Sequence, residues 1–396
     1  MKIVSVDAIQ LKRLDVSAQT PVLCRINTDE GIYGYGEAGV SIFDYSVGAY
    51  QLIKLMAKMI IGMDPLDTDA VYHKLAGNFW AQGNGGVIMA AISAIDTALW
   101  DIKGKYFGVP CCKLLGGVHR TKLRTYASQL QFGWKSETFM ASPGDIGFLQ
   151  EACHAAVEDG YDSVKIDLIS KRLDGKPTSS EEMHIHFQPS TMRELEKKLD
   201  ACRQALGSDI DIILENHNGT TAMTAIEFAR MAEPYGIMFL EEPASPLSPM
   251  DYQRIAAHTN IPLATGERTY TRRGFLPLFQ TGCLSVAQPD LGNCGGYTEG
   301  RKICDMAEAF SISVQTHTCN TPISVAAALQ FEAAIPNFII HEHHNVNTLK
   351  EVTDLCIYNY QPVDGYFEIP DRPGIGNELS EKALAEAVVI ESVKGA

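Results

Sequence analysis

The segments DIILEN at residues 211–216 and IMFLEE at 237–242 decide the fold, because each is a short apolar run that ends in a polar or charged side chain. Amphipathic stretches such as TMRELEKKLDACRQALG (191–207) and GRKICDMAEAFS (300–311) separate segments of this kind. Six further segments repeat the pattern: LRTYAS (123–128), SVKIDL (163–168), IPLATGE (261–267), LSVAQPD (284–290), ISVQTH (312–317) and NFIIHE (337–342). Eight strand–helix units in about 230 residues predict an α/β fold of the TIM-barrel type.

The residues before this repeat have a different pattern. Residues 1–40 contain the alternating segments IVSVDAIQL, VLCRINT and IYGYGEAG, the last two joined by Asp29-Glu30-Gly31, and they predict antiparallel strands. From Gln51 to Gly108 the apolar period becomes helical. We therefore expect a small α+β domain at 1–120, a barrel at 121–360, and a C-terminal segment at 361–396 that packs back on the small domain.

Composition excludes several classes of protein. The 396 residues include 33 Lys and Arg against 48 Asp and Glu, a net charge of −15 that argues against nucleic acid or an anionic membrane as the partner. No apolar run is long enough to cross a membrane, and the N-terminus lacks the apolar stretch of a secretory signal, so we expect a cytoplasmic protein. The ten cysteines lack metal-binding spacing and predict reduced thiols.

Ionisable side chains follow seven of the eight predicted strands. The carboxyl ends of barrel strands converge on one mouth, where the active sites of such barrels lie. The side chains concerned are Lys165 and Asp167, Glu215 and His217, Glu241 and Glu242, Glu267, Asp290, His317, and Glu342.

Glu215, Glu241 and Glu267 end three consecutive strands. Three carboxylates directed at one point repel each other unless a cation lies between them. Ligands that offer only oxygen favour Mg²⁺ before Mn²⁺ or Ca²⁺, and they argue against zinc. A single glutamate at such a position is more often a helix cap or a surface charge, but three in succession favour a metal site.

Asp290 and His317 end the next two strands and predict an acid–base pair. A carboxylate on one imidazole nitrogen would fix the tautomer and leave the other nitrogen as a general base. A lone buried histidine is more often structural, but the polar neighbours favour catalysis. Lys165 is either a base or a cation that neutralises a developing enolate, and His217 is either a proton donor or an exposed loop residue.

Taken together, these motifs resemble the mandelate racemase subgroup of the enolase superfamily. The resemblance covers almost the whole chain and implies a modified (β/α)7β barrel with an N-terminal capping domain. Its motifs are K-x-D at 165–167, E-N-H at 215–217, EEP at 241–243, GER at 266–268, PD-x(4)-GG at 289–296, T-H at 316–317, HEHH at 341–344, and the helix ALWDIKGK at 98–105.

The resemblance implies removal of the proton α to a carboxylate, giving an enediolate stabilised by Mg²⁺. By analogy the three glutamates hold the metal, and Asp290 with His317 supplies the base. Lys165 and Glu342 would flank the substrate carboxylate, with Glu342 protonated and donating a hydrogen bond. Glu215 departs from the family pattern, which more usually has Asp at this position.

Within the subgroup, the pattern resembles acid-sugar dehydratases similar to galactonate dehydratase, which carry a histidine two residues after the first metal ligand, as His217 is here. Racemases have K-x-K, whereas Asp167 stands at the second Lys position and is expected to orient Lys165 or keep it protonated. The implied reaction removes the C2 proton with His317 and protonates the departing 3-hydroxyl with His217. The product would be a 2-keto-3-deoxy sugar acid.

The resemblance also suggests where the distal end of the sugar acid binds. The segments 14–21 and 41–46 are expected to close over it, and Trp80 is a candidate for the same contact, although a core tryptophan is the more usual interpretation. Further candidates for contacts with substrate hydroxyls are Arg268, His341, His343 and His344.

Residues 170–191 lack periodicity and predict a long loop, which would shape specificity, mediate subunit contacts or be a solvated excursion. The family resemblance also suggests a homo-oligomer, often an octamer. Two other functions stay open. One is a racemase or epimerase of a 2-hydroxy acid on the same scaffold, and the other is a non-catalytic member that binds a metabolite and acts in regulation.

Overall fold

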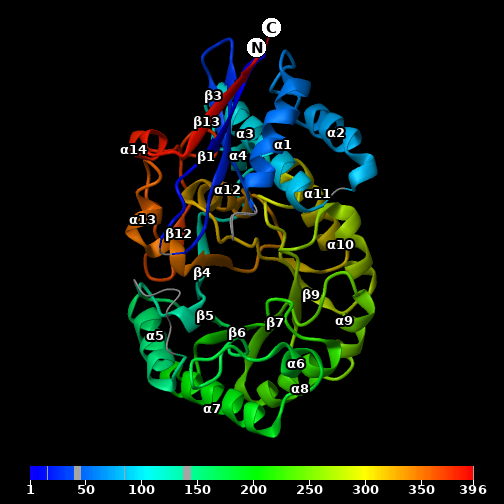
Figure 1. Cartoon of the computed structure of the whole chain (residues 1–396), viewed down its shortest axis with the longest axis vertical. Coiled ribbons are helices and arrows are strands. Elements are labelled where there is room, and N and C mark those ends of the chain that lie inside the picture. Colours follow the sequence, from blue (N-terminus) through cyan, green and yellow to red (C-terminus); the bar gives the residue numbers. More distant parts are fainter. Residues whose placement is uncertain (16, 40–45, 84, 137–143, 396) are drawn as a thin grey trace.

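The computed structural model describes residues 1–15, 17–39, 46–83, 85–136 and 144–395. An eight-stranded barrel and a four-stranded antiparallel sheet organise these residues. In Figure 1 the barrel and its surrounding helices fill the lower part of the molecule, and the small sheet stands at the top beside both chain ends. No helix among the described residues is long and apolar enough to cross a membrane.

The barrel strands are parallel and follow the chain order, which confirms the predicted α/β barrel. Neighbouring strands pair from β4 to β10, and β11 lies beside β4. An isolated bridge between Val314 and Phe338 closes the ring between β10 and the segment before β11. The strands are β4 (Lys122–Ser128), β5 (Ser163–Ile166), β6 (Asp211–Glu215), β7 (Ile237–Glu241), β8 (Leu263–Thr265), β9 (Leu284–Ala287), β10 (Ser313–Val314) and β11 (His341–His344).

Amphipathic helices cover the outside of the barrel, as Figure 1 shows for α5 to α10. Their buried faces pack on the strands because apolar residues recur at helical spacing, as Leu195, Leu199, Cys202 and Leu206 do in α7. The helices are α5 (Ile146–Glu158), α6 (Ser180–His184), α7 (Pro189–Leu206), α8 (Ala222–Ala232), α9 (Pro249–Ala256), α10 (Thr271–Gln280), α11 (Gly296–Ala309), α12 (Pro322–Ala333) and α13 (Lys350–Thr353).

Two details differ from the sequence prediction. The last strand was expected at 337–342, but the regular ladder with β4 begins only at His341, which places Glu342 inside the strand. The segment 170–191 is not a featureless loop, because it holds a bridge between Lys171 and Pro177 and the short helix α6. Arg172 fastens this segment to α7 through paired contacts with Glu194 at 2.7 and 2.8 Å.

The small sheet has the order β13-β1-β2-β3. The hairpin between β2 and β3 confirms the turn predicted at residues 29–31. Its strands are β1 (Ile3–Gln10), β2 (Val22–Thr28), β3 (Tyr33–Ala38) and β13 (Val389–Lys394), and the helices before the barrel are α1 (Ser46–Ile60), α2 (Thr68–Asn78), α3 (Gly86–Phe107) and α4 (Cys111–Leu114). The elements between the barrel and β13 are β12 (Tyr366–Glu368) and α14 (Glu381–Ala385).

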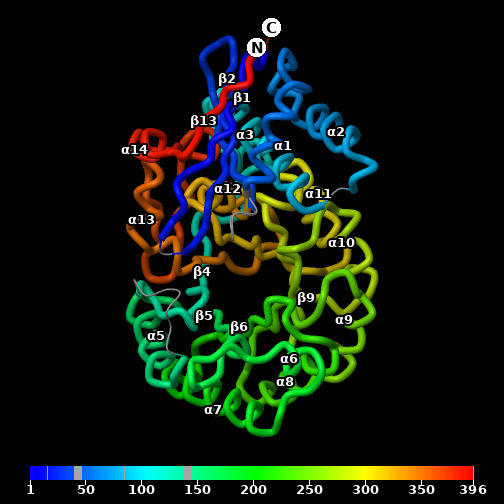
Figure 2. Tube along the Cα trace, viewed as in Figure 1, coloured from blue at the N-terminus to red at the C-terminus, as the bar shows by residue number. Residues whose placement is uncertain are grey.

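The strand β13 joins the two ends of the chain. It pairs antiparallel with β1 over six residue pairs, from Ser5 with Lys394 to Gln10 with Val389. Figure 2 traces the red C-terminal strand alongside the blue N-terminal strand. The division into domains at residues 120 and 360 stays a prediction.

Helix α3 packs directly against β3, and glycine makes the close approach possible. A Cβ added at Gly36 would overlap the carbonyl oxygen of Ala94, and one added at Gly34 would lie 2.9 Å from the backbone nitrogen of Ile102. The helix ends where the sequence predicts, at Phe107, with Gly108 in the left-handed region at φ 67°.

We predict that Gly36→Ala lowers the free energy of unfolding by about 1–3 kcal/mol, because the added methyl group must push α3 away from the sheet. Gly77→Ala in α2 is the matched control, since a Cβ there meets nothing within 4 Å. It should be neutral or stabilise by about 0.4–1 kcal/mol. Urea denaturation followed by circular dichroism measures both, and equal midpoints for the two variants would contradict the packing argument.

Candidate active site

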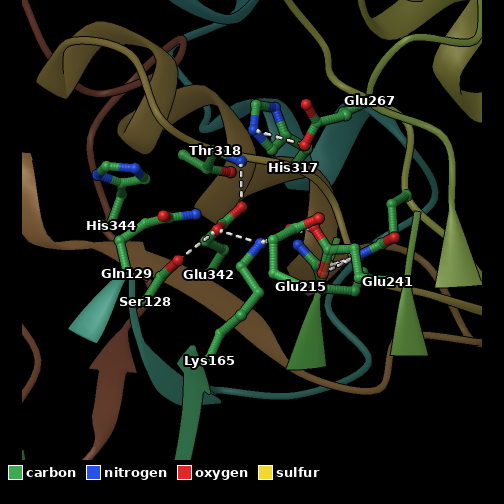
Figure 3. A network of polar contacts seen from close by, with 12 residues as sticks. Ser128, Gln129, Lys165, Glu215, Glu241, Glu267, His317, Thr318, Glu342 and His344 are labelled. Atoms are coloured by element: carbon green, nitrogen blue, oxygen red, sulfur yellow. Dashed lines mark hydrogen bonds and ion pairs between the residues drawn. The ribbon is translucent and has the colours of Figure 1, made fainter. Parts of the chain in front are cut away.

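The parallel strands deliver ionisable side chains to one mouth of the barrel, because all their carboxyl ends point the same way. Lys165 lies in β5, and Glu215 and Glu241 are the last residues of β6 and β7, directly paired in the ladder. The remaining members of this group follow or lie within the next strands: Glu267 after β8, Asp290 after β9, His317 after β10, and Glu342 in β11. Figure 3 shows most of these side chains converging on one point.

Glu215, Glu241 and Glu267 form a group whose carboxylate oxygens lie within 4.8 Å of one another. The first two side chains are 0% and 1% exposed, and Glu267 is 11% exposed. Burial raises the pKa of Glu215 to about 7, and burial together with the negative charge of Glu215 raises the pKa of Glu241 well above its usual value. The donor set consists of oxygen alone and carries excess negative charge, so it fits a divalent cation that prefers oxygen ligands.

The Lys165 ammonium group lies among three carboxylates (Figure 3). Its Nζ is 2.6 Å from Glu241 Oε1, 2.9 Å from Glu342 Oε1 and 3.1 Å from Glu215 Oε2. Burial opposes the charge, but the carboxylates outweigh it and hold the pKa of Lys165 well above its usual value. Lys165 is therefore a cation at neutral pH, which favours the electrophilic interpretation over the base.

Glu342 differs from its predicted state. Its Oε1 also accepts a hydrogen bond from Ser128 Oγ at 2.7 Å, and its Oε2 accepts one from the Thr318 amide at 3.0 Å. Burial disfavours ionisation, yet attraction to Lys165 and His317 prevails and holds the pKa of Glu342 well below its usual value. The expectation of a protonated Glu342 is wrong for this arrangement, because Lys165, Ser128 and the Thr318 amide all donate to its oxygens.

Asp290 and His317 form the predicted pair. Asp290 Oδ2 lies 2.8 Å from His317 Nδ1, and His317 Nε2 lies 3.2 Å from Glu267 Oε2. Asp290 Oδ1 accepts a hydrogen bond from the Gly292 amide at 2.6 Å, which fixes the carboxylate. Burial lowers the pKa of His317, but Glu267, Cys319 and Asp290 raise it well above its usual value. The contact with Asp290 leaves Nε2 as the reactive nitrogen.

Asp167 has a different partner from the one expected. Its Oδ2 lies 2.8 Å from His217 Nδ1, and its Oδ1 accepts hydrogen bonds from the amides of Ile169 and Ser170 at 3.0 and 2.9 Å. The prediction that Asp167 orients Lys165 is corrected, because β5 ends at Ile166 and the carboxylate turns toward the loop that follows. The site therefore holds a second Asp–His pair.

Strand alternation divides the histidines of β11. His341 and His343 are 0% and 1% exposed and lie behind the barrel wall, where His341 Nδ1 is 2.6 Å from Glu332 Oε2 and His343 Nδ1 is 2.6 Å from Tyr161 Oη. Both stack edge-on against Phe367, so substrate contact by His341 or His343 is contradicted. His344 shares the inner face with Glu342 and lies near Gln129 in Figure 3.

The remaining substrate candidates have mixed outcomes. Trp80 is 79% exposed, so the interpretation as a core residue is wrong, and its contact with substrate stays a prediction. Arg268 forms ion pairs with Glu242 and Glu267 and lines a pocket of about 570 Å³ with Asn218, among others.

The two closing segments lie partly outside the described residues, at residue 16 of the first and 41–45 of the second. In the described part of the first, Gln19 Nε2 donates to the carbonyl oxygen of Cys319 at 2.8 Å, two residues after His317.

Four polar residues near the site carried no motif signal. Ser128 ends β4, the one strand without a terminal charge, and Gln129 follows it with a left-handed φ of 73°. Gln288 Nε2 donates to Glu241 Oε2 at 2.6 Å and to Gln315 Oε1 at 2.5 Å. Their positions at strand ends were visible in the sequence, but uncharged amides are common in loops, so the pattern did not separate them from ordinary loop residues.

Comparison with known proteins identifies the two parts of the chain. Residues 2–116 match the mandelate racemase / muconate lactonizing enzyme N-terminal domain, and residues 148–383 match the enolase C-terminal domain-like family. A D-galactonate dehydratase of Variovorax paradoxus (strain S110) is 32% identical over 92% of this chain and 90% of its own length. A D-xylonate dehydratase of Haloferax volcanii is 31% identical over 93% and 85%.

Solved structures give the same result for the fold. A member of the enolase superfamily from Salmonella Typhimurium is 44% identical, with a TM-score of 0.95 over 99% of this chain and 100% of that one. The 3,6-anhydro-D-galactonate cycloisomerase of Zobellia galactanivorans is 26% identical, with a TM-score of 0.84 over 98% and 100%.

We predict that divalent-cation affinity falls as the pH drops below about 7. The pKa of Glu215 is about 7 and that of Glu241 lies well above its usual value, and both groups must lose their protons to become ligands. Affinity should therefore fall by about tenfold or more for each pH unit below about 7. Titration calorimetry with Mg²⁺ at pH 5.5, 6.5, 7.5 and 8.5 measures the trend. An affinity that stays constant from pH 5.5 to 7.5 would contradict the assignment of Glu215 as a ligand.

Proposed function

Because this chain belongs to the enolase superfamily, with mandelate racemase-type N- and C-terminal domains, we propose that it is an Mg²⁺-dependent acid-sugar dehydratase. Its substrate would be an aldonate or aldarate, galactonate-like, and its product a 2-keto-3-deoxy sugar acid. One observation carries the proposal: two separate Asp–His pairs, Asp290 with His317 and Asp167 with His217, border one group of three glutamates. Dehydration needs both a base and an acid, and each pair can fill one role.

Glu215, Glu241 and Glu267 would hold Mg²⁺, since they offer only carboxylate oxygens within 4.8 Å of one another. When bound, the ion supplies positive charge beside the substrate carboxylate, where negative charge accumulates during the reaction. The Gln288 side-chain amide donates a hydrogen bond to Glu241 Oε2 at 2.6 Å, and this bond would orient the Glu241 carboxylate toward the ion.

His317 would remove the proton from C2. Against the effect of burial, Glu267 raises the pKa of His317, and with Glu267 serving as a metal ligand its charge would no longer favour the imidazolium. The neutral ring would then donate its Nδ1–H to Asp290 and accept the proton at Nε2, while the electron pair of the C–H bond moves toward the substrate carboxylate. Asp290 is fixed by the Gly292 amide and stabilises the imidazolium that forms. Asp290 thus orients and stabilises His317 as the aspartate does in other Asp–His pairs.

Lys165 would stabilise the same negative charge from the opposite direction. Its ammonium group carries no basic lone pair at neutral pH, so it is suited to an electrostatic role. Glu342 anchors Lys165 at 2.9 Å and is itself held by Ser128 and the Thr318 amide. The lysine is therefore positioned before substrate arrives, and no reorganisation is needed during the reaction.

His217 would donate a proton to the hydroxyl that leaves C3. The electron pair left by the C2 proton forms the C2–C3 double bond as the C3–O bond breaks, and the oxygen departs as water. The enol product then tautomerises to the 2-keto-3-deoxy acid.

We also propose that the protein is a cytoplasmic homo-oligomer. The exposed apolar side chains of Leu247 (90% exposed) and Met250 (72% exposed) support an assembly surface.

A second candidate function is epimerisation at C2. The pair of Asp167 and His217 favours it, because a histidine with its own carboxylate can serve as a second base as well as an acid. Epimerisation would transfer protons at C2 and leave the C3 hydroxyl in place, so the two functions differ in their products.

The test is a screen of diastereomeric aldonic and aldaric acids with Mg²⁺, in which formation of a 2-keto acid is detected. A single strong substrate would support dehydration. Epimer formation or C2 deuterium exchange without a 2-keto acid would favour the second candidate. Binding of a sugar acid with neither reaction would contradict both and favour a regulatory member.

We predict that His317→Asn abolishes exchange of the C2 proton with solvent, with a loss of at least about 10²–10⁴-fold, because the general base is gone. Mg²⁺ affinity should stay within about threefold of wild type, since His317 is not one of the three glutamates. NMR in D₂O measures exchange, and calorimetry measures the metal. Exchange that persists in this variant would refute the assignment of the base.

A further inference from the structure

Asp167 and His217 belong to a closed ring of polar contacts at the mouth of the barrel. His217 Nδ1 lies 2.8 Å from Asp167 Oδ2, and His217 Nε2 lies 3.3 Å from Gln129 Nε2. Gln129 Oε1 accepts a hydrogen bond from Gln131 Nε2, and Gln131 Oε1 accepts one from the Asp167 amide at 3.1 Å. Each member is held by two neighbours, so the imidazole has one orientation.

The carboxylate of Asp167 is fixed independently of the histidine. Its Oδ1 accepts hydrogen bonds from the amides of Ile169 and Ser170, and the residue is 6% exposed. Lys165 forms its ion pairs with Glu215, Glu241 and Glu342 instead. Asp167 Oδ2 therefore serves His217 among the described residues.

The backbone of His217 is also constrained. Its φ is 44° and that of Asn218 is 56°, both in the left-handed region, and its amide donates to Glu215 Oε1 at 2.6 Å. Non-glycine residues rarely adopt this region, so surrounding contacts must offset its strain. The strained backbone places the ring between Asp167 on one side and Gln129 on the other.

This geometry fixes the roles of the two ring nitrogens. Nδ1 carries a proton and donates it in a hydrogen bond to Asp167, so Nε2 is the nitrogen that exchanges a proton with the substrate. Gln129 Nε2 lies 3.3 Å from His217 Nε2 and donates to it in this state, so His217 must take up a proton at Nε2, in place of this contact, before it can act as an acid.

We propose that Asp167 is a positioning residue for His217, so that losing it impairs departure of the C3 hydroxyl more than removal of the C2 proton. The inference rests on the proposed dehydratase function, which already assigns the two steps to His317 and His217, and adds Asp167 to the second of them. The proton moves from Nε2 to the hydroxyl oxygen, the C2–C3 double bond forms as the C3–O bond breaks, and the oxygen departs as water. His217 is then neutral, and its Nδ1–H still donates to Asp167. The charge of Asp167 stabilises the imidazolium before that transfer.

The test compares Asp167→Asn with Asp290→Asn in the Mg²⁺-loaded enzyme, with the sugar acid that wild-type enzyme dehydrates, in D₂O. The asparagine is nearly isosteric and can keep the hydrogen bonds from Ile169 and Ser170 through its Oδ1. Asp167→Asn should lower 2-keto acid formation about 10²–10³-fold while deuterium still enters C2 of the recovered substrate at a rate within about threefold of wild type. Asp290→Asn should lose exchange and dehydration together.

A mutant cycle separates positioning from a general structural role. In a His217→Gln background, adding Asp167→Asn should lower dehydration by less than about twofold more, because the group that Asp167 positions is already gone. Asp167→Glu keeps the charge but displaces it by one methylene, and it should also lower dehydration more than exchange. Asp167→Glu replaces Asp167→Asn in the test if Asp167→Asn fails to fold, as judged by circular dichroism and Mg²⁺ binding.

Three results would overturn the inference: exchange and dehydration falling by the same factor in Asp167→Asn, neither changing, or the two losses multiplying in the cycle. Wild-type enzyme that exchanges or epimerises C2 without forming a 2-keto acid would instead overturn the proposed function, and this inference with it. Wild-type dehydration combined with a parallel loss in Asp167→Asn would overturn the inference alone.

Discussion

The rest of the site depends on the repulsion between buried carboxylates at the barrel mouth. Glu215, Glu241 and Glu342 lie within 3.1 Å of a single ammonium group, and Glu267 adds a fourth negative charge beside them. One lysine cannot balance this charge in a region of low dielectric constant. Burial is the main reason why the pKa of Glu215 rises to about 7, and the carboxylates of Glu267 and Glu242 add to it. The excess negative charge explains why a divalent cation fits the group.

Regular elements were predictable because periodicity is a local property of the sequence. Seven of the eight barrel strands and the β2–β3 hairpin lie where apolar alternation or apolar runs predict them, and α3 ends at Phe107, before Gly108. The error at the last strand arose because NFII continues the apolar run while regular pairing begins only at His341. His341 was mistaken for a substrate contact because alternation was not applied within this strand: with Glu342 directed inward, His341 faces outward.

Partners of loop residues were harder to predict than strand positions. Asp167 follows β5 by one residue, so neither strand alternation nor the proximity of Lys165 in sequence determined where its carboxylate turned. The ionised state of Glu342 depends mainly on Lys165 and His317, which come from two other strand ends and outweigh the effect of burial. Such choices depend on tertiary contacts, and the similar fold of a cycloisomerase indicates that barrel geometry alone does not select a reaction.

The pairing of β13 with β1 has a consequence for biosynthesis. The β1 strand is synthesised long before β13, so one of its edges meets its partner only after about 380 further residues have been made. At typical elongation rates that delay is on the order of half a minute. During this time an unpaired strand edge is open to association with other nascent chains, so the small sheet is the part of the molecule with most need of chaperone protection.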